Sequence, residues 1–154
     1  MIIDFHNHYF PPRYLDAIRS GGSRFRVTVD GDGNPVLHSP GDYNVLVPGH
    51  RDLAFRARVL EDVGVDKQVL TFTAPGTSIE TPDRAVELCR VINDAFASDV
   101  SAWGGRFTAL AHLPMNAPDA AVEEATRAVT ELGLPGVMLL SNASGVPLSD
   151  DRFL

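Results

Sequence analysis

Residues 3–8 read Ile-Asp-Phe-His-Asn-His, and they decide how the rest of the chain is interpreted. Met1 to Phe5 form a short, mostly apolar run that predicts a strand at the start of the chain. His6 and His8 are two positions apart at the end of that strand, so their side chains point to the same face. Two imidazoles on one face can bind a divalent metal ion such as zinc. We therefore predict that His6 and His8 are metal ligands; the alternative is a pair of polar residues bonded to the backbone at a strand end.

Short apolar runs alternate with amphipathic segments from residue 50 onward. The runs predict buried strands at residues 68–73, 107–111 and 137–140. The amphipathic segments predict helices over residues 51–63, from Pro82 through Phe96 and from Pro118 through Leu132. Strands of this kind, separated by amphipathic helices, are typical of an α/β fold with a parallel sheet that helices cover.

A different pattern occupies residues 24–47. Arg24 to Val29 alternate as in a strand, and Asp30 to Asn34 are dense in turn-forming residues. Residues 36–38 and 43–47 can add two further strands. We predict a small antiparallel insertion after the first strand.

The composition narrows the classes of partner. The chain has 154 residues, with 13 Lys and Arg against 20 Asp and Glu, and a net charge of −7. Such an acidic chain, without basic clusters, is expected to bind neither nucleic acid nor a membrane. The single cysteine, Cys89, excludes an internal disulfide and a Cys-based zinc finger. No apolar run approaches the ~18 residues of a membrane span and the start lacks a signal-peptide pattern, so we expect a cytoplasmic protein.

Several stretches of the chain resemble a known family. Residues 3–11, Ile-Asp-Phe-His-Asn-His-Tyr-Phe-Pro, are similar to the opening of the amidohydrolase superfamily. They look most like the branch that contains aminocarboxymuconate-semialdehyde decarboxylase and related aromatic-acid decarboxylases. The similarity continues through residues 52–56, 64–69, 106–111 and 134–139, so it covers nearly the whole chain.

This resemblance implies a distorted TIM (β/α)8 barrel with an antiparallel insertion after its first strand. It also implies that His6 and His8 bind the metal, which is Zn²⁺ or another divalent ion. The family's other ligands, two histidines and an aspartate on later strands, have no counterpart here, and a full barrel takes roughly 250 residues. We therefore expect the N-terminal half of a barrel, about four βα units over residues 1–154 with the insertion at about 24–47. The catalytic residues are unknown and are expected in the missing C-terminal half; the full-length form is expected to be a homodimer.

The predicted activity also follows from the resemblance. It is the metal-dependent, non-oxidative decarboxylation of an aromatic or unsaturated carboxylic acid, so the expected partner is a small-molecule carboxylate. One alternative is a metal-dependent hydrolase of a small cyclic or amide or ester substrate, because both reactions use the same two histidines. Another is a non-catalytic half barrel that acts through a partner chain, because exposed strand edges favour association.

Three further polar residues are candidates for substrate binding. Arg51 lies where the insertion gives way to the helix predicted over residues 51–63, and it can pair with a substrate carboxylate or is a solvated first-turn arginine. His112 follows a predicted core strand and either faces the metal pocket or is a plain rim residue. Asn142 follows the last predicted strand and either donates to the substrate or forms an ordinary turn.

Overall fold

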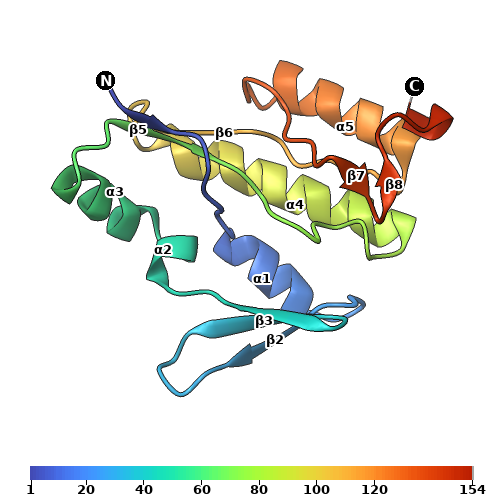
Figure 1. The fold of residues 1–154 in the computed structure, drawn as a ribbon, viewed down its shortest axis with the longest axis horizontal. Coiled ribbons are helices and arrows are strands. Elements are labelled where there is room, and N and C mark those ends of the chain that lie inside the picture. Colours follow the sequence, from blue (N-terminus) through green and yellow to red (C-terminus); the bar gives the residue numbers. More distant parts are fainter. Residues whose placement is uncertain (154) are drawn as a thin grey trace.

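A parallel three-stranded sheet forms the centre of the computed structural model, which describes residues 1–153 (Figure 1). Its strands are β1 (Ile3–Asp4), β5 (Lys67–Leu70) and β6 (Phe107–Ala109), in the order β1-β5-β6. Ile3 pairs with Lys67, and Gln68 pairs with Phe107. Because the strands are parallel, the segments that follow them all leave from one edge of the sheet.

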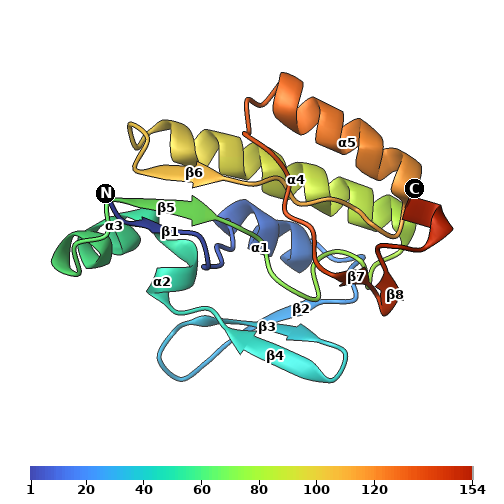
Figure 2. The ribbon, with the colours of Figure 1, turned by 45° about the horizontal axis from the view of Figure 1, so that its top comes forward.

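Helices cover this sheet, as the alternating pattern predicts. They are α1 (Pro12–Arg19), α3 (Leu53–Asp62), α4 (Pro82–Ser101) and α5 (Pro118–Thr130), with a single turn, α2 (Pro48–Arg51), before α3. Proline begins α1, α4 and α5, where its missing N–H costs no helical hydrogen bond. Figure 2 shows α4 running behind the sheet, with α5 beside it. The α/β class is confirmed.

The antiparallel insertion is present as a separate sheet, drawn below α1 in Figure 2. It consists of β2 (Arg26–Val29), β3 (Pro35–Ser39) and β4 (Asp42–Val45). The Asp30 carboxylate accepts from the backbone N–H groups of Asp32 and Asn34, at 2.9 and 2.7 Å, and so closes the first turn. This explains why a run rich in Asp, Gly and Asn reverses the chain there.

Aromatic packing holds the insertion and α1 against the end of β5. The ring of Phe72 lies 4.9 Å from that of Tyr14 and 5.1 Å from that of Phe10, centroid to centroid, in edge-to-face contacts. Tyr14 in turn contacts Phe25, just before β2. All four rings are buried, so this cluster fixes the loop that follows β1.

The predicted helix over 51–63 begins later than expected. The Asp52 carboxylate accepts from the backbone N–H groups of Ala54 and Phe55, at 2.8 and 3.0 Å, so Asp52 is an N-cap and α3 begins at Leu53. Arg51 therefore ends the preceding turn, α2. At α4, Thr81 is the N-cap position, but its side chain makes no capping bond.

The predicted fourth core strand at 137–140 is wrong. It is reduced to one bridge between Ala111 and Val137, with backbone bonds from Ala111 to Gly136 and from Met138 to Ala111. No further strand in residues 1–153 pairs with its outer side, and Leu139 is 44% exposed. A two-stranded hairpin that the sequence did not indicate follows, made of β7 (Asn142–Ala143) and β8 (Val146–Pro147).

A short 3-10 turn, Asp151–Phe153, ends the part of the chain that the structure describes. Leu154, the last residue of the domain expected over 1–154, lies outside the described residues. Among residues 1–153, no helix is both long and apolar enough to cross a bilayer.

Candidate metal centre

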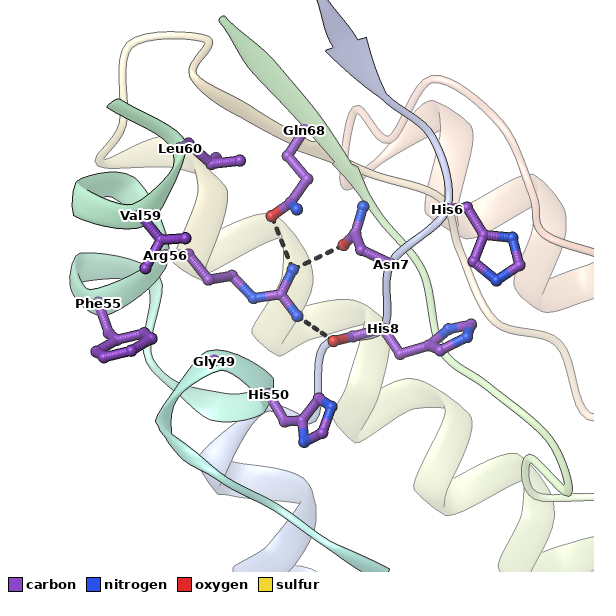
Figure 3. A pocket seen from close by; sticks show the side chains of 10 residues that line it. All are labelled: His6, Asn7, His8, Gly49, His50, Phe55, Arg56, Val59, Leu60 and Gln68. Atoms are coloured by element: carbon purple, nitrogen blue, oxygen red, sulfur yellow. Dashed lines mark hydrogen bonds between the residues drawn. The ribbon is translucent and has the colours of Figure 1, made fainter. Parts of the chain in front are cut away.

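His6 and His8 lie just past the end of β1, at the edge from which the segments after the three parallel strands leave. Their ring centroids are 5.4 Å apart and the rings meet edge to face. Figure 3 shows both imidazoles on the same side of the chain, as the i, i+2 spacing predicts. His6 is exposed and His8 is half-buried, so the pair is open to a ligand.

Asn7, between the two histidines, points to the other side of the chain (Figure 3). Its side-chain Nδ2 donates to the backbone carbonyl of Val69 at 2.9 Å. The backbone carbonyl of Asn7 accepts from Thr71 Oγ1 at 2.6 Å. Two residues further on, the backbone N–H of Tyr9 donates to the backbone carbonyl of Thr71 at 3.0 Å. These bonds tie the histidine segment to the end of β5.

Arg56 of α3 reaches the same segment from the Asn7 side. The side chain is buried, and its Nη1 donates to Asn7 Oδ1 at 2.8 Å and to Gln68 Oε1 at 2.7 Å. Its Nη2 donates to the backbone carbonyl of His8 (Figure 3). Burial lowers the pKa of Arg56 to about 10, although Tyr9 and Asp4 oppose that effect. Arg56 is still protonated at neutral pH.

His8 is disposed to be a neutral imidazole, the form that binds metals. Burial lowers its pKa, and the nearby charges of His6, His50 and Arg56 lower it further. The Thr71 hydroxyl, which donates to the Asn7 carbonyl, lies 3.4 Å from His8 Nδ1. An N–H at Nδ1 then faces a hydroxyl lone pair, and Nε2 keeps its own lone pair for a metal.

Two imidazoles at this separation fit one divalent ion, since zinc binds an imidazole nitrogen at about 2.0–2.1 Å. Within residues 1–153, however, no group of three or more His, Cys, Asp or Glu side chains is placed to hold a metal. A catalytic zinc usually has three protein ligands. His6 and His8 alone would be fewer protein ligands than such a zinc ion takes.

An open pocket of about 350 Å³ adjoins this segment. Its wall combines His8, His50 and Arg56 with apolar residues of α3 (Phe55, Val59 and Leu60). His50 Nδ1 is buried and has no hydrogen-bond partner among residues 1–153. Neither His50 nor Arg56 was predicted to belong to the site.

A sequence signal for Arg56 does exist. Leu53, Arg56 and Leu60 follow the 3-4 spacing of one helix face, and all three are buried. An arginine on an apolar face indicates a buried cation with specific acceptors. Its acceptors lie on other elements, so the sequence does not identify them.

The structure brings His6 and His8 together but places the other three predicted residues elsewhere. Arg51 lines a different hollow, and its Nε donates to the carbonyl of Leu46 at 3.0 Å. His112 is buried, where burial lowers its pKa to about 4, and its Nε2 accepts from the Thr77 N–H at 3.2 Å. Asn142 is exposed in β7 and caps its own turn by accepting from Gly145 N at 3.0 Å.

A family model described as amidohydrolase matches residues 3–154. The chain belongs to the amidohydrolase family. This match includes the His6 and His8 pair and nearly the whole of the described structure.

The relatives of this amidohydrolase chain include decarboxylases. It is 36% identical over 105 residues to the gamma-resorcylate decarboxylase of Rhizobium sp. strain MTP-10005, covering 65% of this chain and 32% of that one. It is 39% identical over 69 residues to the 2-amino-3-carboxymuconate-6-semialdehyde decarboxylase of Dictyostelium discoideum, covering 45% of this chain and 19% of that one.

The fold also matches that of a solved decarboxylase. The dihydroxybenzoic acid decarboxylase of Polaromonas sp. JS666, with bound manganese and the inhibitor 2-nitroresorcinol, superposes with a TM-score of 0.70 at 26% identity. The superposition covers 99% of this chain and 43% of that one. The chain therefore has the fold of part of an amidohydrolase barrel and spans less than half the length of these relatives.

Proposed function

We propose that this chain supplies metal ligands to a non-oxidative decarboxylase of an aromatic or unsaturated carboxylic acid. The observation that carries the proposal is the pair of imidazoles of His6 and His8 on one side of the chain, in a segment that the amidohydrolase match includes. The relatives named above support the reaction class, because their names describe decarboxylases of carboxylic acids.

The proposed metal is Zn²⁺ or another divalent ion, held by His6 and His8 together with ligands from outside residues 1–153. Manganese in the Polaromonas enzyme supports a divalent ion. When bound, such an ion supplies positive charge to a substrate oxygen.

The chain's own residues would prepare that site in two ways. Burial favours the neutral His8 imidazole, and Thr71 orients it. In the reaction itself, the carbon–carbon bond to the carboxylate breaks, carbon dioxide leaves, and a proton takes its place on the substrate carbon. We assign neither the proton donor nor the substrate-binding groups to residues 1–153.

A second candidate is a part-barrel that acts through a partner chain. It is favoured by exposed apolar side chains on the edge strand β1 and its flanks (Ile2, Ile3 and Phe5) and along α3 and its C-cap (Phe55, Val59 and Val63). The homodimer and the cytoplasmic location expected from the sequence also stay predictions. A hydrolase of a cyclic, amide or ester substrate is tested alongside the decarboxylase.

The first experiment measures metal binding by the 154-residue chain. Isothermal titration with Zn²⁺ and with Mn²⁺ compares the wild type with a His6→Ala/His8→Ala variant. The matched control is His38→Ala, which removes an imidazole from the antiparallel sheet, where it contacts Thr28. We expect one site in the wild type and the control and none in the double variant. Equal binding by the double variant would overturn the metal assignment.

The second experiment tests the reaction on the polypeptide isolated from its source cells. Its intact mass and its elution in gel filtration are recorded first. Carbon dioxide release from 2,6-dihydroxybenzoate and ester hydrolysis are then assayed with added metal. Metal-dependent carbon dioxide release supports the decarboxylase. Ester hydrolysis without carbon dioxide release supports the hydrolase. A chain that self-associates and shows neither activity supports the part-barrel.

A further inference from the structure

Arg56 is a buried cation whose contacts converge on the segment that carries the two histidines. We propose that Arg56 is a positioning residue that holds the chain at Asn7 and His8 so that both imidazoles face the metal side. The inference rests on the proposed metal function of His6 and His8 and adds a residue that does not touch the metal. Its three hydrogen-bond acceptors are the side chains of Asn7 and Gln68 and the backbone carbonyl of His8.

The need for such a residue lies in the strand pairing. Regular pairing of β1 with β5 ends at Asp4 and Gln68, and the next bridge joins His8 to Thr71. Between them the chain is held by side chains instead of a continuous backbone ladder. A segment of this kind keeps its orientation only if those side chains are themselves fixed.

Arg56 fixes two of the groups that set this orientation. Asn7 is held at both ends of its amide, because Oδ1 accepts from Arg56 and Nδ2 donates to the Val69 carbonyl. The same guanidinium binds the carbonyl of His8, one peptide further on. Alternate side chains of an extended chain point to opposite faces, so anchoring Asn7 on one side turns His6 and His8 to the other (Figure 3).

The charge on Arg56 indicates more than a packing role. The side chain is only 6% exposed, yet its hydrogen-bond acceptors are neutral. The negative charge of Asp4 is linked to Arg56 only through Gln68, which accepts from Arg56 and donates to Asp4 Oδ2 at 2.6 Å. A buried cation without a directly bonded carboxylate is costly, and an apolar side chain would fill the same space more cheaply. Only a planar guanidinium can donate from a fork of N–H groups to several acceptors at once, as Nη1 and Nη2 of Arg56 do here.

Substrate binding by Arg56 does not fit the same geometry. The guanidinium lies on the Asn7 side of the chain, opposite the imidazoles (Figure 3). Both terminal nitrogens already donate to protein oxygens, and the ring of Tyr9 lies 5.8 Å from the guanidinium carbon. The residue therefore acts on the metal site through the chain it holds.

The test compares the zinc affinities of folded variants of the whole chain. Arg56→Met removes the fork while keeping the length of the side chain, and Arg56→Lys keeps the charge but not the fork. The control is Arg58→Met, an exposed position two residues along α3. Titrations are made at a temperature where circular dichroism shows every variant folded, so that partial unfolding does not lower the measured zinc affinity.

We expect zinc affinity to fall about 10-fold or more in Arg56→Met, the loss typical for a residue that orients a metal ligand. Arg56→Lys is expected to lie between Arg56→Met and the wild type, and Arg58→Met to equal the wild type. Unchanged affinity in folded Arg56→Met would overturn the proposal. If Arg56→Met does not fold, Gln68→Met decides, because it removes one acceptor of the fork; a weaker affinity supports the proposal and an equal one overturns it.

Failure of the metal site itself gives a different result. A wild type that binds zinc no better than His6→Ala/His8→Ala overturns the metal assignment and, with it, the role of Arg56. A wild type that binds zinc in a His6- and His8-dependent way, with unchanged affinity in Arg56→Met, overturns only the role of Arg56.

Discussion

The side chain of Asn93 bonds both backbone groups of His112. Its Nδ2 lies 2.9 Å from the carbonyl oxygen of His112, and its Oδ1 lies 2.8 Å from the amide nitrogen. Asn93 belongs to α4 and His112 to the segment that follows β6, so one amide ties a helix to the edge where the candidate site lies. The same Nδ2 donates to Glu124 of α5 at 2.7 Å.

Replacing this amide is expected to be costly. Asn93→Leu leaves both backbone groups of His112 without a partner in a buried place, and each unsatisfied group costs about 1–3 kcal/mol. We expect the free energy of unfolding to fall by about 2–4 kcal/mol, measured by urea denaturation. Ser98→Ala, at an exposed position of α4, is the control and should change it by less than about 0.5 kcal/mol. A small effect of Asn93→Leu would mean that water replaces the amide.

Stability should fall in mild acid because of His112. Burial lowers the pKa of His112 from 6.5 to about 4, so the unfolded chain takes up this proton at a higher pH than the folded chain. The contribution of the neutral, buried His112 to the free energy of unfolding is complete above pH 6.5 and is lost as the pH falls toward 4. At about 1.4 kcal/mol per pKa unit it amounts to about 3 kcal/mol.

The measurement is the free energy of unfolding between pH 7.5 and 4.5. Burial also lowers the pKa of His8, and the pKa of Glu124 is lowered too by Arg127 and Asn93 despite its burial, so other groups contribute in the same direction. The comparison is therefore with His112→Gln, which should show a clearly smaller loss of stability over this range. Equal slopes for the two proteins would exclude His112 as the cause.

Gly76 is expected to tolerate no side chain. Its φ is +62°, and a Cβ there would lie 2.7 Å from Cε1 of His112. Gly33 has a φ of +82° with open space around it, so Gly33→Ala carries the backbone cost alone, about 1 kcal/mol. Gly76→Ala should lower the free energy of unfolding by about 1–3 kcal/mol more than Gly33→Ala does, because its Cβ clashes with His112; thermal unfolding measures both. Similar losses in both variants would mean that His112 moves aside freely.

Glu80 is expected to hold the loop that leads into the insertion. Its buried carboxylate accepts from the Ser23 hydroxyl and, at 3.0 and 3.1 Å, from the backbone N–H of Arg24. Glu80→Gln keeps the shape but weakens these charge-assisted bonds, so hydrogen exchange at Arg24 should speed up by about 10-fold or more. The exposed Glu123→Gln on α5 is the control. Unchanged exchange at Arg24 would show that packing alone holds the loop.

Local pattern predicts much of the fold and part of the site. The helices begin near the predicted prolines, and the insertion forms because Asp30 closes its first turn. His6 and His8 face one side because alternation in an extended chain is a local steric property. The predicted strand at 137–140 is wrong, since a strand also needs a partner on its outer side and residues 1–153 provide none.

The sequence by itself determined the α/β class, the insertion and the pairing of His6 with His8, because each depends on residues only a few positions apart. Only the tertiary structure decided what surrounds that pair. Arg56 reaches Asn7 across 49 positions and His8 across 48, and Asn93 reaches His112 across 19. Contacts at such separations depend on how helices pack on the sheet, and no local periodicity encodes them. The same reason explains why residue type alone did not locate three other candidates. The side chains of Arg51, His112 and Asn142 make hydrogen bonds to backbone groups of Leu46, Thr77 and Gly145, away from the two histidines.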